Sequence, residues 1–274
     1  MKVFDSFSFW YEGCYADKAE VIPAARSFAL LHDCHSRARE AVLFIHGYAG
    51  YPGELVSAAQ AVYERGFDCF VPRLPGMGTS GRDFMNTDRN DWLTFARSAL
   101  VSLLDEYGSV SLVAHSMGCL IAFLLQADLP VRRAVLAMPA FSMPQLDRAE
   151  LERLALTKPD IPAEWKSDPR YHLKYENAPC DDEKLGHEYY SHVYPRQLVS
   201  LLDLSDEVKK HSLRVPALIL ASRQDAVTDS SACSRYAADA EIVYFSGATH
   251  YIYYDIDPQC EADAVRMTAD FLLS

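Results

Sequence analysis

A serine in a short Ala-His-Ser-Met-Gly segment is the residue whose surroundings most favour chemistry. Ser116 lies between Val110–Ala114, an apolar run typical of a buried strand, and Met117–Ala127, which can form a helix. A serine at a sharp strand-to-helix turn is held in a strained conformation with its hydroxyl exposed, as in a nucleophile elbow. Gly118 allows the strand and helix to approach closely, whereas Ala114 stands where glycine is usual. Ser116 is therefore a candidate nucleophile, and an ordinary turn is the alternative.

A candidate base and a candidate acid follow in the chain. A serine hydroxyl is a weak nucleophile until a general base removes its proton. His250 lies in a loop after the last expected strand and could serve as that base. Asp225, three residues past Ser222 at the end of an earlier expected strand, could hold the imidazole in one tautomer. Asp229 is the alternative acid, although its position suits the N-cap of the next helix.

A glycine-rich segment matches a nucleotide-binding pattern in its residue types but not in its expected structural context. Gly76–Gly81 fits G-x-G-x-x-G, but a dinucleotide site needs this motif to run directly from a strand into a helix. Pro72 and Pro75 separate it from the preceding strand, and Gly81–Asn86 opens no convincing helix. We therefore expect no dinucleotide cofactor.

Acidic and histidine residues also gather at 183–192, in Glu183, His187, Glu188 and His192. Metal-binding histidines on one helix are expected four residues apart, and these are five apart. The pattern favours a solvated polar face. We expect no metal ion and no cofactor of any other kind.

Alternating strands and helices would position the candidate residues. Strands are expected at 41–46, 67–71, 110–114, 133–138, 216–222 and 241–245, and helices at 54–65, 91–107, 117–127, 230–238 and 258–273. Val3–Tyr11 could add an edge strand. This alternation predicts an α/β fold with a mostly parallel sheet and helices on both faces.

The alternation breaks between about Phe141 and Leu213, which is rich in proline, tyrosine and charge and contains no obvious strand. We therefore expect residues 1–140 and 214–274 to form the core. Residues 141–213 are expected to be an inserted cap over one edge of the sheet.

Length and composition narrow the class of protein. A chain of 274 residues, half of them hydrophobic, suits one large α/β domain. The net charge of −12, without a dense basic cluster, argues against nucleic-acid binding and against stable docking on an anionic membrane. No apolar stretch reaches the roughly 18 residues needed to span a bilayer, and residues 1–14 lack the pattern of a signal peptide. The seven scattered cysteines form no C-x-x-C pair, which is typical of reduced thiols. A cytoplasmic location is expected, and the sequence indicates neither a monomer nor an oligomer.

The motifs together resemble a known family. They are His46-Gly47, Pro75-Gly-Met-Gly78, Ala114-His-Ser-Met-Gly118, Asp225 and His250. Their order is that of the α/β-hydrolase superfamily, and the resemblance covers nearly the whole chain outside the insertion. The phrase Pro72–Ser80 and the position of the insertion are similar to the bacterial carboxylesterase and monoacylglycerol-lipase-like (lysophospholipase-like) branch. Met77 departs from the histidine usual in that branch.

The resemblance implies an α/β-hydrolase fold with an inserted cap, or lid. It implies a catalytic triad of Ser116, Asp225 and His250, which occur in the chain order of this superfamily. It also implies an oxyanion hole made by the backbone N–H groups of Tyr48 and Met117.

Caps in this superfamily roof the acyl pocket, so several large side chains of the insertion are candidate substrate contacts. We select Phe141, Met143, Trp165 and Tyr190. The alternative is that most of them pack the cap against the sheet.

The expected activity is cleavage of a carboxylic ester through an acyl-enzyme. The substrate would be a small-molecule acyl ester: a short- to medium-chain ester, a monoacylglycerol or a lysophospholipid-like molecule. An acyltransferase or a hydrolase of C–C or amide bonds could use the same triad. A non-catalytic binding protein on the same scaffold usually lacks a triad member, and none is missing here.

Overall fold

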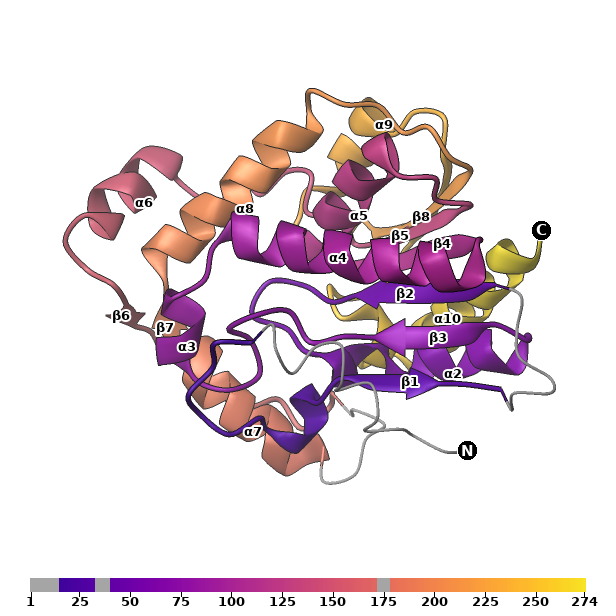
Figure 1. Ribbon diagram of the computed structural model, residues 1–274. Coiled ribbons are helices and arrows are strands. Elements are labelled where there is room, and N and C mark those ends of the chain that lie inside the picture. Colours follow the sequence, from indigo (N-terminus) through magenta and orange to yellow (C-terminus); the bar gives the residue numbers. More distant parts are fainter. Residues whose placement is uncertain (1–14, 33–39, 172–177) are drawn as a thin grey trace.

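A seven-stranded sheet forms the centre of the molecule (Figure 1). The computed structural model describes residues 15–32, 40–171 and 178–274. The strands, in spatial order, are β1 (Phe28–Leu30), β3 (Asp68–Val71), β2 (Ala41–Ile45), β4 (Val110–His115), β5 (Ala134–Ala137), β8 (Ala217–Ser222) and β9 (Glu241–Phe245). All neighbouring pairs are parallel except β1 and β3. The α/β fold and the mostly parallel sheet are confirmed.

Helices cover both faces of the sheet and the carboxyl ends of its strands (Figure 1). They are α2 (Val56–Glu64), α3 (Gly81–Met85), α4 (Arg89–Tyr107), α5 (Met117–Asp128), α6 (Arg148–Ala155), α7 (Ala178–Tyr189), α8 (Pro195–Val208), α9 (Cys233–Tyr236) and α10 (Pro258–Leu273). Short 3₁₀ turns are η2 (Pro23–Ala25), η3 (Pro52–Leu55), η4 (Ser230–Ala232) and η5 (Ile252–Tyr254). One apolar core lies under α4, α5 and α8, and the other under α2 and α10. The central strands have no polar alternation because both of their faces are buried.

The strand order brings several loops together at one edge of the sheet. The chain leaves β2 for β3 on one side and later returns to β4 on the other side of β2. In open parallel sheets, ligands bind outside the carboxyl ends of the strands where the direction of winding changes. In the register of this sheet, Ile45 pairs with Ala114 and His115 pairs with Ala137, so β2, β4 and β5 end close together.

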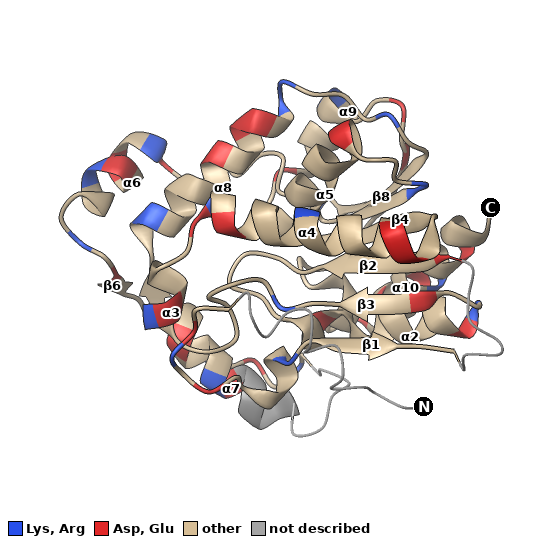
Figure 2. Cartoon of the chain, in the orientation of Figure 1, with Lys and Arg blue, Asp and Glu red and all other residues tan. Residues whose placement is uncertain are grey.

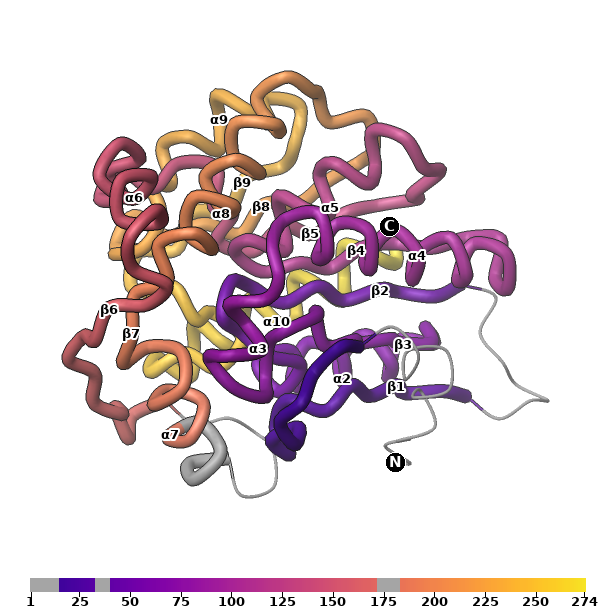
Figure 3. The backbone as a smooth tube through the Cα atoms, turned by 60° about the vertical axis from the view of Figure 1, so that its left-hand side comes forward, coloured from indigo at the N-terminus to yellow at the C-terminus, as the bar shows by residue number. Residues whose placement is uncertain are grey.

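The segment between β5 and β8 lies at the carboxyl ends of the strands, as Figures 1 and 3 show for α6, α7 and the small ribbon of β6 (Ile161–Pro162) and β7 (His192–Val193). Its helix α8 packs against α5 and α4, while α6 packs against α8. Arg148 of α6 forms ion pairs with Asp203 and Asp206 of α8. Figure 2 shows acidic and basic residues interspersed on these two helices.

One helix contradicts the sequence analysis. Gly81–Asn86 was expected to open no helix, but Gly81–Met85 forms α3. The reason is local capping, because the Ser80 hydroxyl accepts a hydrogen bond from the Asp83 backbone N–H. Nine residues still separate the end of β3 from α3, so the arrangement is not a dinucleotide-binding turn.

Short elements account for the remaining differences. The edge strand is formed by β1, while the expected strand at Val3–Tyr11 lies outside the described residues. Within 141–213, where the sequence contains no obvious strand, β6 and β7 pair, and two residues each are too few to produce an alternating pattern. The expected helix at 230–238 is shorter and begins as the 3₁₀ turn η4.

Candidate active site

Ser116 occupies the turn between β4 and α5. Its backbone has φ 54° and ψ −117°, a region that non-glycine residues rarely adopt and that costs on the order of 1–3 kcal/mol. The turn is held by hydrogen bonds from the Ser116 N–H to the Ala137 carbonyl and from the Cys119 N–H to the Ser116 carbonyl. A Cβ atom at Gly118 would lie 2.1 Å from the Ile45 carbonyl oxygen. Glycine is therefore required there, and the turn presses directly against β2.

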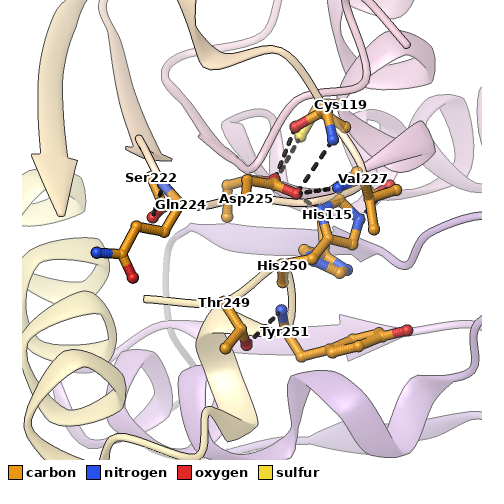
Figure 4. A network of polar contacts seen from close by, with 12 residues as sticks. His115, Cys119, Ser222, Gln224, Asp225, Val227, Thr249, His250 and Tyr251 are labelled. Carbon is orange, nitrogen blue, oxygen red and sulfur yellow. Dashed lines mark hydrogen bonds and ion pairs between the residues drawn. The ribbon is translucent and has the colours of Figure 1, made fainter. Parts of the chain in front are cut away.

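His250 and Asp225 approach Ser116 from the loops after β9 and β8. The Nε2 atom of His250 lies 2.9 Å from Oγ of Ser116, and its Nδ1 atom lies 2.8 Å from Oδ2 of Asp225. The carboxylate of Asp225 also accepts hydrogen bonds from the Val227 N–H and from the N–H and hydroxyl of Thr228. Figure 4 shows Asp225 and Val227 on one loop and His250 on another. The fold thus joins three residues that are far apart in sequence into one hydrogen-bonded chain.

The environment of these side chains sets their charge. Burial by itself would raise the pKa of Asp225, but hydrogen bonds from His250, Thr228 and Val227 outweigh it and lower that pKa, so Asp225 is a carboxylate. Burial is the largest effect on His250 and lowers its pKa, against the opposing hydrogen bond to Asp225. A neutral imidazole whose Nδ1–H faces a carboxylate leaves Nε2 free to accept a proton from the serine. Ser116 is itself only 7% exposed.

Asp229, the alternative acid, caps η4. Its side chain accepts a hydrogen bond from the Ser231 N–H at the start of that turn. Its carboxylate therefore has a local structural partner, whereas Asp225 reaches the imidazole.

The loop after β2 lies against Ser116. A Cβ atom at Gly47 would be 3.1 Å from Cβ of Ser116. Tyr48 follows, with its ring packed edge-on against Phe84 and Trp92. Met117 is the first residue of α5, where a backbone N–H has no acceptor within the helix. Gly47, which precedes Tyr48, thus lies against the Ser116 side chain, and Met117 directly follows Ser116 at the start of α5.

His46 links two loops and lies outside the triad. Its Nε2 atom accepts a hydrogen bond from the Leu74 N–H, and its Nδ1 faces the Gly47 carbonyl oxygen. Burial lowers the pKa of His46 to about 3, opposed in part by the bond to Gly47. The ring is therefore neutral at ordinary pH and serves to tie the end of β2 to the loop after β3.

A cavity of about 240 Å³ opens beside Ser116 and His250. Its other lining residues are Gly47, Tyr48, Glu54, His115, Met143, Gln145, Leu146, Tyr190, Leu198, Leu201, Val227 and Tyr251. One part is apolar, with side chains from α8 and from the loops after β5 and β8. The rest is polar, with Glu54 and His115. Two larger hollows, of about 440 and 400 Å³, lie against α3 and α4 and between α2 and α10, and neither is lined by a triad residue.

Two of the four expected contact residues, Met143 and Tyr190, line this cavity. Phe141 is instead buried in the apolar core against Phe123 and Tyr236, and its carbonyl oxygen accepts a hydrogen bond from the Ser205 hydroxyl of α8. Trp165 lies over α7, where its ring occupies the space left by Gly186.

Several lining residues were not predicted from the sequence, among them Glu54, His115, Leu198, Leu201 and Val227. The i, i+3 spacing of Leu198 and Leu201 on α8 could have indicated an apolar face. No comparable pattern marks Glu54 or His115.

Among the residues that the structure describes, no cluster of three or more His, Cys, Asp or Glu side chains is placed to hold a metal ion. His187 lies on α7 and His192 on β7. Among the helices of residues 15–32, 40–171 and 178–274, none is long and apolar enough to cross a membrane.

Comparison with known proteins gives consistent matches. The family model described as "Alpha/beta hydrolase family" matches residues 42–262. A thermostable monoacylglycerol lipase of Bacillus sp. (strain H-257) is 26% identical over 195 residues, which are 68% of this chain and 70% of that protein. A carboxylesterase of Bacillus subtilis (strain 168) is 26% identical over 97 residues, 35% of this chain and 39% of that protein. Among solved structures, a soluble variant of monoglyceride lipase from Saccharomyces cerevisiae superposes with a TM-score of 0.71 at 16% identity, covering 93% of this chain and 94% of that one.

Proposed function

The protein belongs to the alpha/beta hydrolase family, and we propose that it cleaves carboxylic esters through an acyl-enzyme on Ser116. The observation that carries this proposal is the continuous hydrogen-bonded chain from Ser116 Oγ through His250 to Asp225. The similarity to a monoacylglycerol lipase and a carboxylesterase supports an ester as the substrate.

In the proposed reaction, His250 Nε2 removes the hydroxyl proton as Ser116 Oγ attacks the ester carbonyl carbon. Asp225 stabilises the imidazolium that forms. The backbone N–H groups of Tyr48 and Met117 donate to the oxygen that becomes negative. His250 then gives the proton to the leaving alcohol oxygen as the acyl–oxygen bond breaks. In the second half, His250 removes a proton from water, whose oxygen attacks the acyl carbonyl carbon. His250 returns that proton to Ser116 Oγ as the bond between Ser116 and the acyl group breaks and the carboxylic acid leaves.

We assign the apolar part of the cavity to the acyl chain and residues 141–213 to a cap over it. Met143, Leu146, Leu198 and Leu201 supply apolar surface close to Ser116. A volume of about 240 Å³ is below the range of pockets for drug-sized ligands, which favours a short to medium acyl chain.

The nucleophile is tested with a fluorophosphonate probe, which reacts with an activated serine. We expect wild-type protein to be labelled and Ser116→Ala to be neither labelled nor active, with kcat lower by at least about 10⁴-fold. Ser98→Ala, at an exposed position on α4, is the matched control and should be labelled like wild type. Labelling of the Ser116→Ala protein would refute the assignment.

The acyl pocket is tested by substitutions on α8. Leu198→Phe narrows the cavity and should lower kcat/KM for p-nitrophenyl octanoate at least about tenfold more than for the acetate, a difference of roughly 1.4 kcal/mol. Leu202→Phe, one turn further along α8 and outside the cavity lining, should leave the ratio of the two substrates unchanged. If the ratio of kcat/KM for octanoate to that for acetate were the same in Leu198→Phe and Leu202→Phe, Leu198 would not line the acyl site.

A further inference from the structure

The main chain at His250 belongs to a loop, residues 246–251, without helix or strand. Part of this loop is fixed by Asp255, whose Oδ2 accepts hydrogen bonds from the N–H and the hydroxyl of Thr249. The N–H of Tyr251 in turn donates to the Thr249 hydroxyl. These contacts hold the residues on either side of His250. None of these contacts involves the main chain of His250 itself.

His115, at the end of β4, contacts the main chain of His250. Its Nε2 atom lies 2.8 Å from the His250 carbonyl oxygen, and both groups are buried. A carbonyl oxygen can only accept, so Nε2 carries the hydrogen, and it does so whether or not the other ring nitrogen is protonated. The two imidazole rings are 5.0 Å apart, and Figure 4 shows them close together.

The position of His115 in the chain makes this bond significant. His115 is the last residue of β4 and directly precedes Ser116. β4 lies in the centre of the sheet, paired with β2 and β5. One residue on a rigid strand therefore connects the turn that carries the nucleophile to the main chain of the proposed base.

The other edge of the His115 ring faces Glu54. Its Nδ1 atom lies 3.8 Å from Oε2 of Glu54, within ion-pair range but beyond a hydrogen bond, and has no hydrogen-bond partner among the described residues. A Cβ atom at Gly47 would be 3.5 Å from the same nitrogen. The ring is thus enclosed by the loop after β2, by η3 and by the His250 loop, and its Nε2 atom is turned toward the His250 loop.

We propose that His115 is a positioning residue, whose Nε2–H bond to the His250 carbonyl sets the distance between the His250 imidazole and the Ser116 hydroxyl. This rests on the proposed function, in which His250 is the general base. Asp225 fixes the orientation of the imidazole and His115 fixes its place. A displacement of about 1 Å in a catalytic group can cost about 10²-fold in rate, so a single main-chain contact is sufficient to matter.

The test compares two amides that differ by one methylene group. In His115→Gln the amide N–H can reach the place of Nε2, whereas in His115→Asn it reaches only that of Nδ1. We expect His115→Asn to lower kcat for p-nitrophenyl butyrate by about 10–100-fold with KM within twofold of wild type. The kcat of His115→Gln should lie within about threefold of the wild-type value. Equal losses in the two variants, or no loss in His115→Asn, would overturn the proposal.

A second measurement does not depend on turnover. The proton shared by His250 Nδ1 and Asp225 gives a strongly downfield ¹H NMR signal, which we expect to be kept in His115→Gln and shifted or broadened in His115→Asn. An unchanged signal in a folded His115→Asn protein would contradict the positioning role. If wild-type protein showed the signal but hydrolysed no ester, the proposed function would fail while the positioning role would still be tested by this signal.

Discussion

Strain, burial and hydrogen bonding act together on the triad residues. Ser116 is held at positive φ, His250 is kept neutral by burial, and Asp225 remains charged because three residues donate to its carboxylate. In the proposed reaction, each property would serve one chemical need: a hydroxyl held at the turn, a free Nε2 and a counter-charge for the imidazolium.

The burial of His250 predicts a pH dependence. A general base works only when it is unprotonated, and the pKa of His250 lies below its ordinary value of 6.5. As the pH falls, activity should persist below pH 6.5 and decline only when His250 becomes protonated. We expect the half-maximum of kcat/KM, measured against pH with p-nitrophenyl butyrate, to lie below pH 6.5. A midpoint at or above that value would show that burial does not control this residue.

At the scale of elements, the close contact of α5 with β2 positions Ser116, the proposed nucleophile. Gly118 lets the first turn of α5 rest on the Ile45 and His46 carbonyl groups. The same contact brings the loop after β2 against Ser116. The elbow is therefore a joint product of the β4–α5 turn and a neighbouring strand.

Gly118→Ala should disturb both stability and activity. Its Cβ would lie 2.1 and 2.7 Å from two backbone carbonyl oxygens of a central strand, which cannot move aside easily. We expect a loss of about 1–3 kcal/mol in the free energy of unfolding by urea, together with a large fall in kcat. Gly247→Ala is the control, because the nearest atom to its Cβ would be Oδ2 of Asp257 at 3.7 Å, an ordinary van der Waals contact. Similar stability losses in both variants would mean that the contact with β2 is not the cause.

At the scale of the whole molecule, buried neutral histidines couple folding to pH. His46 binds a proton near pH 6.5 when unfolded but only at about pH 3 when folded. The unfolded state therefore binds more protons between these values, and the free energy of unfolding falls as the pH is lowered through this window. Above pH 6.5 His46 has no such effect. The lowered pKa of His250 acts in the same direction.

This acid sensitivity can be measured by urea unfolding between pH 7 and about pH 4.5. His46 should account for a loss on the order of 2 kcal/mol over this range. His46→Gln can still accept from the Leu74 N–H but does not titrate, so its stability should depend less on pH. His211→Gln changes an exposed histidine and should keep the wild-type slope. Parallel slopes for wild type and His46→Gln would refute the role of His46.

The sequence by itself determined the strand and helix order of the core and the residues that meet at Ser116. Strands buried on both faces leave continuous apolar runs, and the elbow depends on residues next to one another, so both can be recognised locally. Only the tertiary structure decided which side chains of 141–213 face the cavity, because an apolar face on a helix does not by itself distinguish a core contact from a cavity wall. It placed Phe141 in the core and Leu198 in the cavity wall. It also brought Glu54, His115 and His250 together, since contacts between η3, β4 and a distant loop depend on how the chain winds across the sheet.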